Sequence, residues 1–317
     1  MAGNVAFHHV YGTPLIVTAG VDRIRLRRRP RLNADQHLSG KVTWVGNSSM
    51  EIRMQCVEEG TEQEWMEAYF TFVTLDPETK KPVAMPALVP QTNEERVHFE
   101  LGALKAQAKK NRRKNKLTVG QPLTETSLQI DRQAGALLDE AGPLLRMPSL
   151  ADPDSILMSS TRMQNAMIAQ PQALNLHNRI FGGFLMRRAF ELAFANAYVF
   201  GGAKPLFLEV DDISFDSPVD AGDLLVFNSR VLYTMPKGGF LGDYVEDHSD
   251  CPLIMVEVEA WVTEPEKASA KISNHFYFTF SLPKGTPCRR VLPANIDEAR
   301  RMASRMAADV EQSTLRS

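Results

Sequence analysis

Apolar and polar residues alternate along several stretches in the second half of the chain. The alternation is clearest in Leu224–Val231 and Ile254–Val262, and a period of two is typical of antiparallel strands with one buried face. A strand is also predicted ahead of these stretches, at Thr161–Gln170. The four strands predicted further along the chain are Pro205–Phe215, Asp223–Tyr233, Pro252–Val262 and Lys271–Leu282.

A helical period replaces the alternation in Phe184–Phe200. Small and apolar side chains recur there at the spacing of one helix face, and they are Leu185, Ala189, Leu192, Ala193 and Asn196. This pattern predicts a long helix whose one face is buried. The closing stretch, Asn295–Val310, is rich in Ala, Met and Arg, and it is typical of a peripheral amphipathic helix.

The first half of the chain repeats the strand pattern. The strands predicted there are Pro14–Leu26, His37–Val45, Ser49–Val57 and Gln63–Thr74. A basic amphipathic helix is predicted at Asn93–Lys116. Residues 117–156 contain Pro122, Pro143, Pro148 and Pro153, and they are interpreted as a linker.

Two short matches show that the halves are related. Val21-Asp22-Arg23-Ile24 matches Val210-Asp211-Asp212-Ile213, and Tyr69-Phe70-Thr71-Phe72 recurs as Tyr277-Phe278-Thr279-Phe280. The offset grows from 189 to 208 residues, and an insertion in the loop Met235–Ser249 accounts for the difference. Repeats of this size indicate two copies of one fold rather than a solenoid.

Composition excludes several classes of protein. The 317 residues carry a net charge of −2, which argues against a nucleic-acid-binding protein. No apolar run is long enough for membrane insertion. Cys56, Cys251 and Cys288 have no disulfide or metal spacing, and they indicate a reducing compartment with buried or incidental thiols. No metal or other cofactor is expected.

The run from Asn175 to Gly183 carries the candidate chemistry. Gly182 and Gly183 stand at the predicted helix start, where backbone N–H groups and the helix dipole offer an oxyanion site. The Asn175 amide, a few residues upstream, could orient water or a carbonyl group. The alternative is structural: an Asn in a turn and a glycine pair chosen for close packing.

The surrounding residues resemble a known family. The run from Asn175 to Ala193, together with Val210–Phe215 and Val45–Ile52, is similar to the double hot-dog acyl-CoA thioesterases of the mitochondrial acyl-coenzyme A thioesterase 9 type. The resemblance implies an α+β fold of two hot-dog domains, each an antiparallel sheet wrapped around a central helix, with the first incomplete. The expected ranges are 1–116 for the first domain, 117–156 for the linker and 157–317 for the second domain with its C-terminal helix.

The resemblance also implies an activity, which is hydrolysis of acyl-CoA to a free fatty acid and coenzyme A. Asn175 and Gly183 map to the catalytic positions. The residues expected to bind substrate are His177, Asn178, Phe181, Gly182, Arg27 and Arg29. A mitochondrial location and a homo-oligomer formed through the hot-dog sheets are further expectations, although no transit peptide is visible.

The chain departs from the family pattern at the catalytic carboxylate. Phe190 fills the position on the second-copy helix, and the adjacent Glu191 points about 100° away. The repeat offset sets Met1 opposite Phe190, so Met1–His9 is interpreted as the tail of a central helix. The first copy is then truncated, the expected Asp lies upstream of Met1, and the first domain should be the less stable one.

Three functions are therefore weighed. Thioesterase activity is expected, but weak in a truncated chain. The alternative is a catalytically inactive subunit that binds acyl-CoA or assists assembly. A hot-dog hydratase or dehydratase would need an acid–base pair for which no motif is present.

Other charged residues have an ordinary interpretation beside a functional one. The stretch Arg25–Arg31 could bind the phosphates of coenzyme A or form a solvated face, and the second basic stretch, Lys109–Lys116, favours the solvated face. Asp211 and Asp212 could be distant acids or strand-edge residues. Glu51 and Glu257 lie on matching strands and are expected to face solvent.

Overall fold

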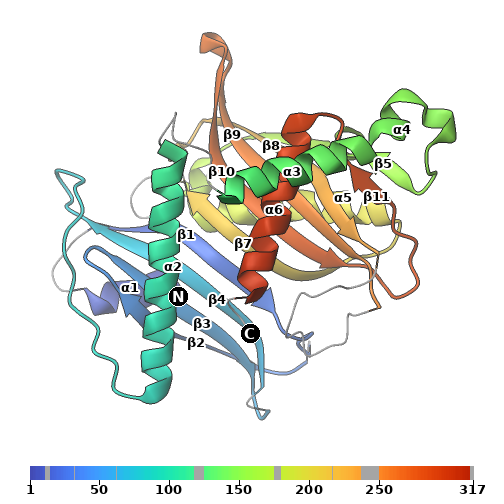
Figure 1. The fold of residues 1–317 in the computed structure, drawn as a ribbon. Helices are drawn as coiled ribbons and strands as arrows, with labels where there is room; N and C mark the ends of the chain where they lie inside the picture. The colour runs from blue at the N-terminus through green and yellow to red at the C-terminus, as the bar shows by residue number, and fades with distance from the viewer. Residues whose placement is uncertain are drawn as a thin grey trace. The chain divides into compact units, whose positions relative to one another are not determined.

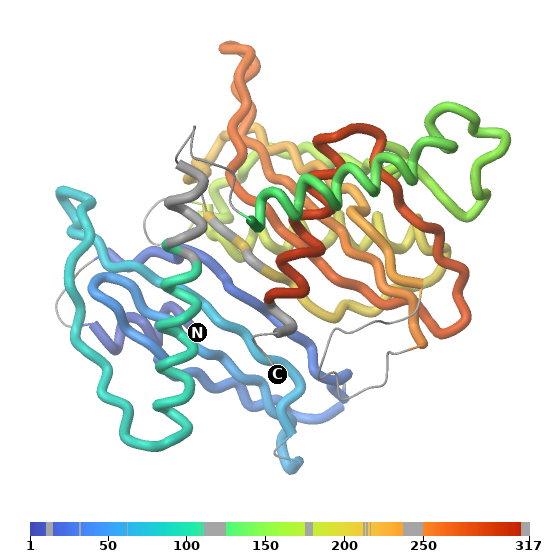
Figure 2. The backbone as a smooth tube through the Cα atoms, viewed as in Figure 1, coloured from blue at the N-terminus to red at the C-terminus, as the bar shows by residue number. Residues whose placement is uncertain are grey.

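The computed structural model describes residues 1–10, 15–31, 33–61, 63–117, 125–174, 180–215, 217–236 and 250–314. Within these ranges the side chains of 109, 111–117, 212, 214 and 312–314 are not described. The chain divides into two compact units. The first comprises Met1–Pro122 with Asp211–Ser214, and the second comprises Leu123–Val210 with Phe215–Ser317. Figures 1 and 2 show the elements and the path of the backbone.

The first unit is an antiparallel sheet with two helices. Its strands are β1 (Leu15–Leu26), β2 (Gln36–Val45), β3 (Ser49–Glu58) and β4 (Glu64–Leu75), and its helices are α1 (Ala2–His9) and α2 (Asn93–Leu117). The strand order is β2-β3-β4-β1, and each neighbouring pair is antiparallel. All four predicted strands are confirmed, and α2 is found where the basic helix was predicted.

The two faces of this sheet differ because side chains alternate along each strand. The apolar face packs against α1, and its buried cluster contains Ala2, Ala6, Met50, Ile52, Met54 and Phe72. The opposite face carries charged side chains, and α2 crosses the strands (Figure 1). Gly102 permits close contact, since a Cβ there would lie 2.5 Å from the Cβ of Trp44. Helix α2 begins with a capping box, in which Thr92 and Glu95 satisfy each other's backbone N–H groups.

The second unit is a larger antiparallel sheet. Its main strands are β6 (Met163–Ile168), β7 (Leu206–Phe215), β8 (Leu224–Met235), β9 (Leu253–Glu264) and β10 (Ser269–Ser281). The part of β7 at Asp211–Ser214 groups with the first unit. The strand order is β7-β10-β9-β8-β6. A separate parallel pair joins β5 (Ser155–Leu157) to β11 (Arg290–Leu292). The helices are α3 (Glu125–Glu140), α4 (Gly142–Arg146), α5 (Gly182–Gly201) and α6 (Ile296–Thr314), with short 3-10 turns at Pro148–Leu150, Met158–Thr161, Pro171–Ala173 and Pro265–Lys267.

Helix α5 is the buried helix that the periodicity predicted. All five side chains of the predicted face are buried. The polar member, Asn196, donates to the carbonyl of Thr161 at 2.9 Å and to Oγ of Ser229 at 2.8 Å, so its amide is satisfied inside the core. The helix ends at Gly202, whose φ of 64° permits the left-handed cap.

The strand order confirms the internal repeat. The matched segments lie in β1 and β7 and in β4 and β10. The order β1-β4-β3-β2 in the first unit corresponds to β7-β10-β9-β8 in the second. Because each unit packs an antiparallel sheet on a helix, the expected α+β hot-dog class is confirmed.

The stretch interpreted as a linker contains ordered structure. Helix α3 packs on α6 through a buried cluster of Ala134, Ala299 and Ala303. The prolines misled the prediction, since Pro143 lies in the first turn of α4 and Pro148 begins a 3-10 turn. Proline suits such positions because the first N–H groups of a helix have no intrahelical acceptor. No helix in the described part of the chain is long and apolar enough to cross a membrane.

Candidate functional site

The start of α5 provides the candidate oxyanion site. Phe181 is the N-cap residue in an extended conformation, and its carbonyl accepts from the N–H of Phe184 at 2.9 Å. The N–H groups of Gly182 and Gly183 occupy the first helical turn, where the helix itself supplies no acceptor. No acidic side chain stands in that turn, so the positive end of the helix dipole is not offset within it.

Backbone contacts close the loop that precedes this helix start. Leu174 and Ile180 form an antiparallel bridge. The N–H of Phe181 donates to the carbonyl of Ala173 at 2.8 Å, and that of Ile180 donates to the carbonyl of Val219 at 3.0 Å. Residues 175–179 join the two sides of the bridge. The predicted site residues Asn175, His177 and Asn178 belong to this segment and lie outside the described residues.

Both glycines are in close contact with aromatic rings. A Cβ on Gly182 would lie 2.4 Å from the ring of Phe215, and one on Gly183 would lie 2.4 Å from the ring of Phe181. These contacts support the packing interpretation of the glycine pair. The oxyanion interpretation uses the backbone N–H groups, so the two roles are compatible. The Phe181 residue is 56% exposed beside the helix start.

The carboxylate position on α5 is occupied by an aromatic cluster. The ring of Phe190 contacts those of Phe194, Phe207, Phe278 and Phe280, with centroids 5.3–6.1 Å apart. This packing agrees with the expectation that Phe190 does no proton chemistry.

Glu191 is held by neighbouring arginines. It accepts from Arg187 at 3.0 Å and from Arg188 at 2.9 Å. The hydrogen bond from Arg187 is the main cause that lowers the pKa of Glu191. A carboxylate held in this way is a poor general acid at neutral pH.

The candidate phosphate-binding arginines differ in their surroundings. Arg27 forms an ion pair with Glu67 at 2.9 Å and lies 3.8 Å from Glu64. Burial acts to lower the pKa of Arg27, but the carboxylates of Glu67 and Glu64 outweigh it and raise the pKa. Arg29 is exposed. A phosphate group would therefore compete with Glu67 for Arg27.

The expectation that Glu51 and Glu257 face solvent is wrong. Glu51 is 3% exposed and Glu257 is fully buried. Each lies on the charged face of its sheet, as the alternation predicted, but a helix covers that face. Glu51 accepts from Thr43 at 2.9 Å and from Lys105 of α2 at 3.1 Å.

In the second unit, both oxygens of Glu257 accept from Arg301 of α6 at 2.9 Å. Arg230 lies 3.2 Å from the same carboxylate. Glu257 and Glu259, together with His275, have ligand atoms within 4.8 Å of one another. Arg230 and Arg301 also pair with Glu259, so the cluster is neutralised by arginine and fits a network of ion pairs.

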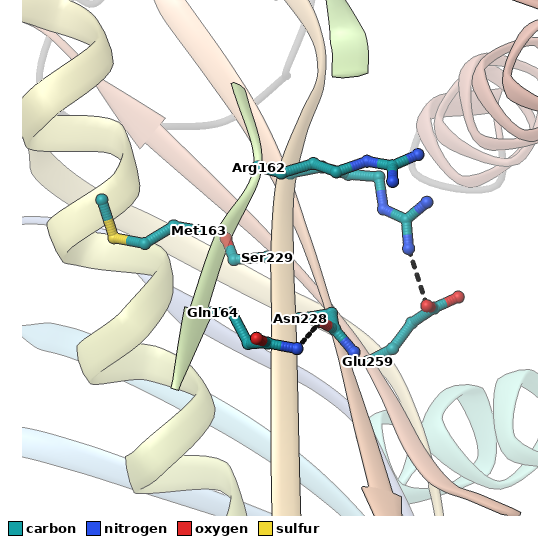
Figure 3. Close-up of a pocket in the computed structure, with 7 residues that line it drawn as sticks. Arg162, Met163, Gln164, Asn228, Ser229 and Glu259 are labelled. Carbon is teal, nitrogen blue, oxygen red and sulfur yellow. Dashed lines mark hydrogen bonds and ion pairs between the residues drawn. The ribbon is translucent and has the colours of Figure 1, made fainter. Parts of the chain in front are cut away.

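A polar pocket of about 420 Å³ lies beside this network. It is lined by Arg162, Met163, Gln164, Asn228, Ser229, Arg230 and Glu259. Figure 3 shows Gln164 and Asn228 pointing toward one another, and their amides are 2.9 Å apart. The sequence signal was present in Glu257 and Glu259, which share one strand face, but the covering helix could not be placed from the sequence.

Comparison with known proteins gives the family. No protein-family model matches the chain. Acyl-coenzyme A thioesterase 2, chloroplastic, from Humulus lupulus is 42% identical over 309 residues, which cover 93% of this chain and 67% of that relative. Acyl-coenzyme A thioesterase 9, mitochondrial, from Homo sapiens is 33% identical over 285 residues, which cover 88% of this chain and 61% of that relative.

A solved structure shows a weaker likeness. An acyl-CoA hydrolase from Staphylococcus aureus, in complex with butyryl coenzyme A, coenzyme A and coenzyme A disulfide, has 22% identity and a TM-score of 0.42, with 51% of this chain and 92% of that chain covered. The chain spans 59–67% of the length of its relatives named chloroplastic or mitochondrial. The identity to these relatives, over most of the chain, gives the conclusion that the chain belongs to the acyl-CoA thioesterase family.

Proposed function

We propose that this protein hydrolyses acyl-CoA thioesters to a free fatty acid and coenzyme A. The observation that carries the proposal is the start of α5, where the Gly182 and Gly183 N–H groups follow directly on the bridged loop that contains Asn175. Family membership supports the same activity.

The proposed chemistry uses backbone and amide groups. The thioester carbonyl oxygen accepts a hydrogen bond from the Gly183 N–H, which polarises the carbonyl carbon. Water held by Asn175 adds to that carbon, and the negative charge that develops on the oxygen is stabilised at the helix N-terminus. The carbon–sulfur bond then breaks, and the proton lost by water goes to the sulfur of coenzyme A.

We propose the following contacts to the substrate. The exposed ring of Phe181 offers an apolar surface next to the helix start, and His177 and Asn178 supply polar contacts from the loop. Arg27 and Arg29 are proposed to bind the phosphates of coenzyme A, because guanidinium groups bind phosphate oxygens in pairs.

A second candidate function is an acyl-CoA-binding or assembly subunit without hydrolysis. Phe190 in place of a carboxylate, and Glu191 held by Arg187 and Arg188, favour it. In that case the protein would bind acyl-CoA but would not hydrolyse it.

The test is release of free thiol from a panel of acyl-CoAs, with calorimetric measurement of coenzyme A binding alongside. Asn175→Ala should abolish hydrolysis, and Asn33→Ala, an exposed turn residue in the first unit, should leave it unchanged. Binding without hydrolysis in the unsubstituted chain would establish the second candidate. Neither binding nor hydrolysis would contradict both.

We also propose a mitochondrial location and a homo-oligomer formed through the hot-dog sheets. Relatives named mitochondrial support the location, while another is named chloroplastic. Fractionation of expressing cells, with immunodetection in the mitochondrial fraction, tests it. Detection in plastids alone would contradict it.

A further inference from the structure

Helix α2 has an apolar stripe on its outward face. Val97, Leu101 and Leu104 are 55%, 37% and 61% exposed. The spacing of four and then three residues places all three on one side of the helix, and Ala108 continues the stripe. Gly102 lies on the side of α2 that faces the sheet, and Lys105, four residues after Leu101, reaches Glu51 from the edge of the stripe. Because its three large side chains are exposed, the unit's own sheet does not cover the stripe.

The corresponding helix of the second unit has a covered outer surface. Helices α2 and α6 each pair a basic side chain with a buried glutamate, and the two glutamates lie on the matching strands β3 and β9. Lys105 of α2 pairs with Glu51, and Arg301 of α6 pairs with Glu257. Helix α3 packs on α6 and buries Ala299 and Ala303. Within the described part of the first unit, no helix packs in this way on α2. The repeat thus provides a precedent for a second helix packed on the helix that supplies the cation.

The charges of α2 indicate which helix could pack there. Acidic residues, Glu94, Glu95 and Glu100, belong to its first half. Its second half is basic, with Lys105, Lys109, Lys110, Arg112, Arg113, Lys114 and Lys116. If two α2 helices packed in parallel, their basic second halves would lie side by side and repel one another. Two antiparallel copies would set acidic halves along basic halves, and their helix dipoles would also oppose.

We propose that α2 binds α2 of a second copy of this chain in an antiparallel pair. A twofold axis between residues 102 and 103 would place Leu101 of each copy against Leu104 of the other, and Val97 against Ala108. This interface is self-complementary, as a twofold dimer requires, and the alternating spacing of four and three residues is that of a coiled-coil seam. It is separate from the sheet-mediated contacts proposed above and independent of the thioesterase activity.

Sedimentation velocity over a range of protein concentrations tests the association. Leu101→Glu and Leu104→Glu change exposed side chains, so the fold should persist, as circular dichroism would verify. Each should raise the Kd of the α2-dependent dimerisation by about tenfold or more, since an apolar contact is replaced by a charge. The matched control is Leu128→Glu, which changes a leucine 39% exposed on α3 and should leave the Kd unchanged. Unchanged association in both α2 variants, or equal weakening by Leu128→Glu, would overturn the proposal.

Disulfide trapping tests the orientation. A Leu101→Cys chain mixed with a larger, tagged Leu104→Cys chain should give mainly the mixed disulfide. The unsubstituted chain, with its three free cysteines, supplies the background. Disulfides within each variant alone, in preference to the mixed product, would show a parallel pair and overturn the proposal. Binding of α2 to anionic phospholipid vesicles with no self-association would overturn it too, since the stripe would then serve a lipid surface.

Discussion

At the scale of single residues, the most informative finding is the pair of buried glutamates on matching strands. Glu51 and Glu257 were expected to face solvent, and both do lie on the side of the sheet away from the apolar core. The sequence could not reveal that α2 and α6 cover this side. A buried carboxylate needs a cation and hydrogen bonds to be tolerated, and Lys105 and Arg301 supply them.

The first prediction concerns Arg301. Arg301→Met should lower the free energy of unfolding by about 2 kcal/mol, because Glu257 would lose one partner while it stays buried. This loss of stability is smaller than for a fully buried ion pair, because the Arg301 side chain is 34% exposed and Arg230 still contacts Glu257. Urea unfolding measures the change. Arg300→Met is the control, because its pair with Asp131 is exposed on both sides, and it should cost less than about 0.5 kcal/mol.

The second prediction concerns acid. Burial acts to raise the pKa of Glu259, but the charges of Arg230 and Arg301 outweigh it, and the pKa lies below its ordinary value. The stability that this carboxylate contributes is therefore complete above the unfolded-state pKa of about 4.3. It is lost as the pH falls through the lower folded-state pKa. Unfolding free energies measured from pH 7 to pH 3 should fall less steeply in Glu259→Gln. If the unfolding free energy fell equally steeply with pH in the unsubstituted protein and in Glu259→Gln, the ionised Glu259 would not be a source of the acid sensitivity.

At the scale of elements, the sequence predicted the regular parts well. Strands with one buried face and a helix with one buried face leave clear periods, and α5 and the eight long strands are found within a few residues of their predicted ends. Helices α3 and α4 were missed because prolines were interpreted as linker signals. The contacts of α3 are small side chains such as Ala134, which give a weak apolar period. Asn175 and its neighbours stay predictions, because they lie outside the described residues.

The third prediction concerns the packing of α3 on α6. Ala134 is fully buried in that contact, and Ala134→Glu should lower the free energy of unfolding by about 3 kcal/mol, since it places a charge and extra volume in a closed interface. Hydrogen exchange should show faster exchange along 125–140. Arg132→Glu, on an exposed side of the same helix, should change neither measurement. Unaltered exchange in Ala134→Glu would contradict the packing.

At the scale of the whole molecule, the chain is a duplication in which the two copies have diverged. Each unit has its own apolar core, around Ile52 in the first and around Phe278 in the second. The core of the first unit includes only an eight-residue helix, α1, on its apolar face. Helix α5 of the second unit has 20 residues, so the first unit should unfold at the lower temperature.

The fourth prediction follows from these two cores. Scanning calorimetry should show two transitions, because units with separate cores unfold separately. Ile52→Ala should lower only the first transition and Phe278→Ala only the second, each through the cavity it leaves. A single transition shifted by both variants would show that the units unfold as one.

The bridge between Leu174 and Ile180 has a consequence for engineering. The hydrogen bonds beside it come from the backbone, so positions 176–179 can be exchanged while the bridge and the proposed catalytic Asn175 are retained. A combinatorial library over positions 176–179, with Asn175 kept, could be selected for the proposed hydrolysis of one acyl chain length at a time.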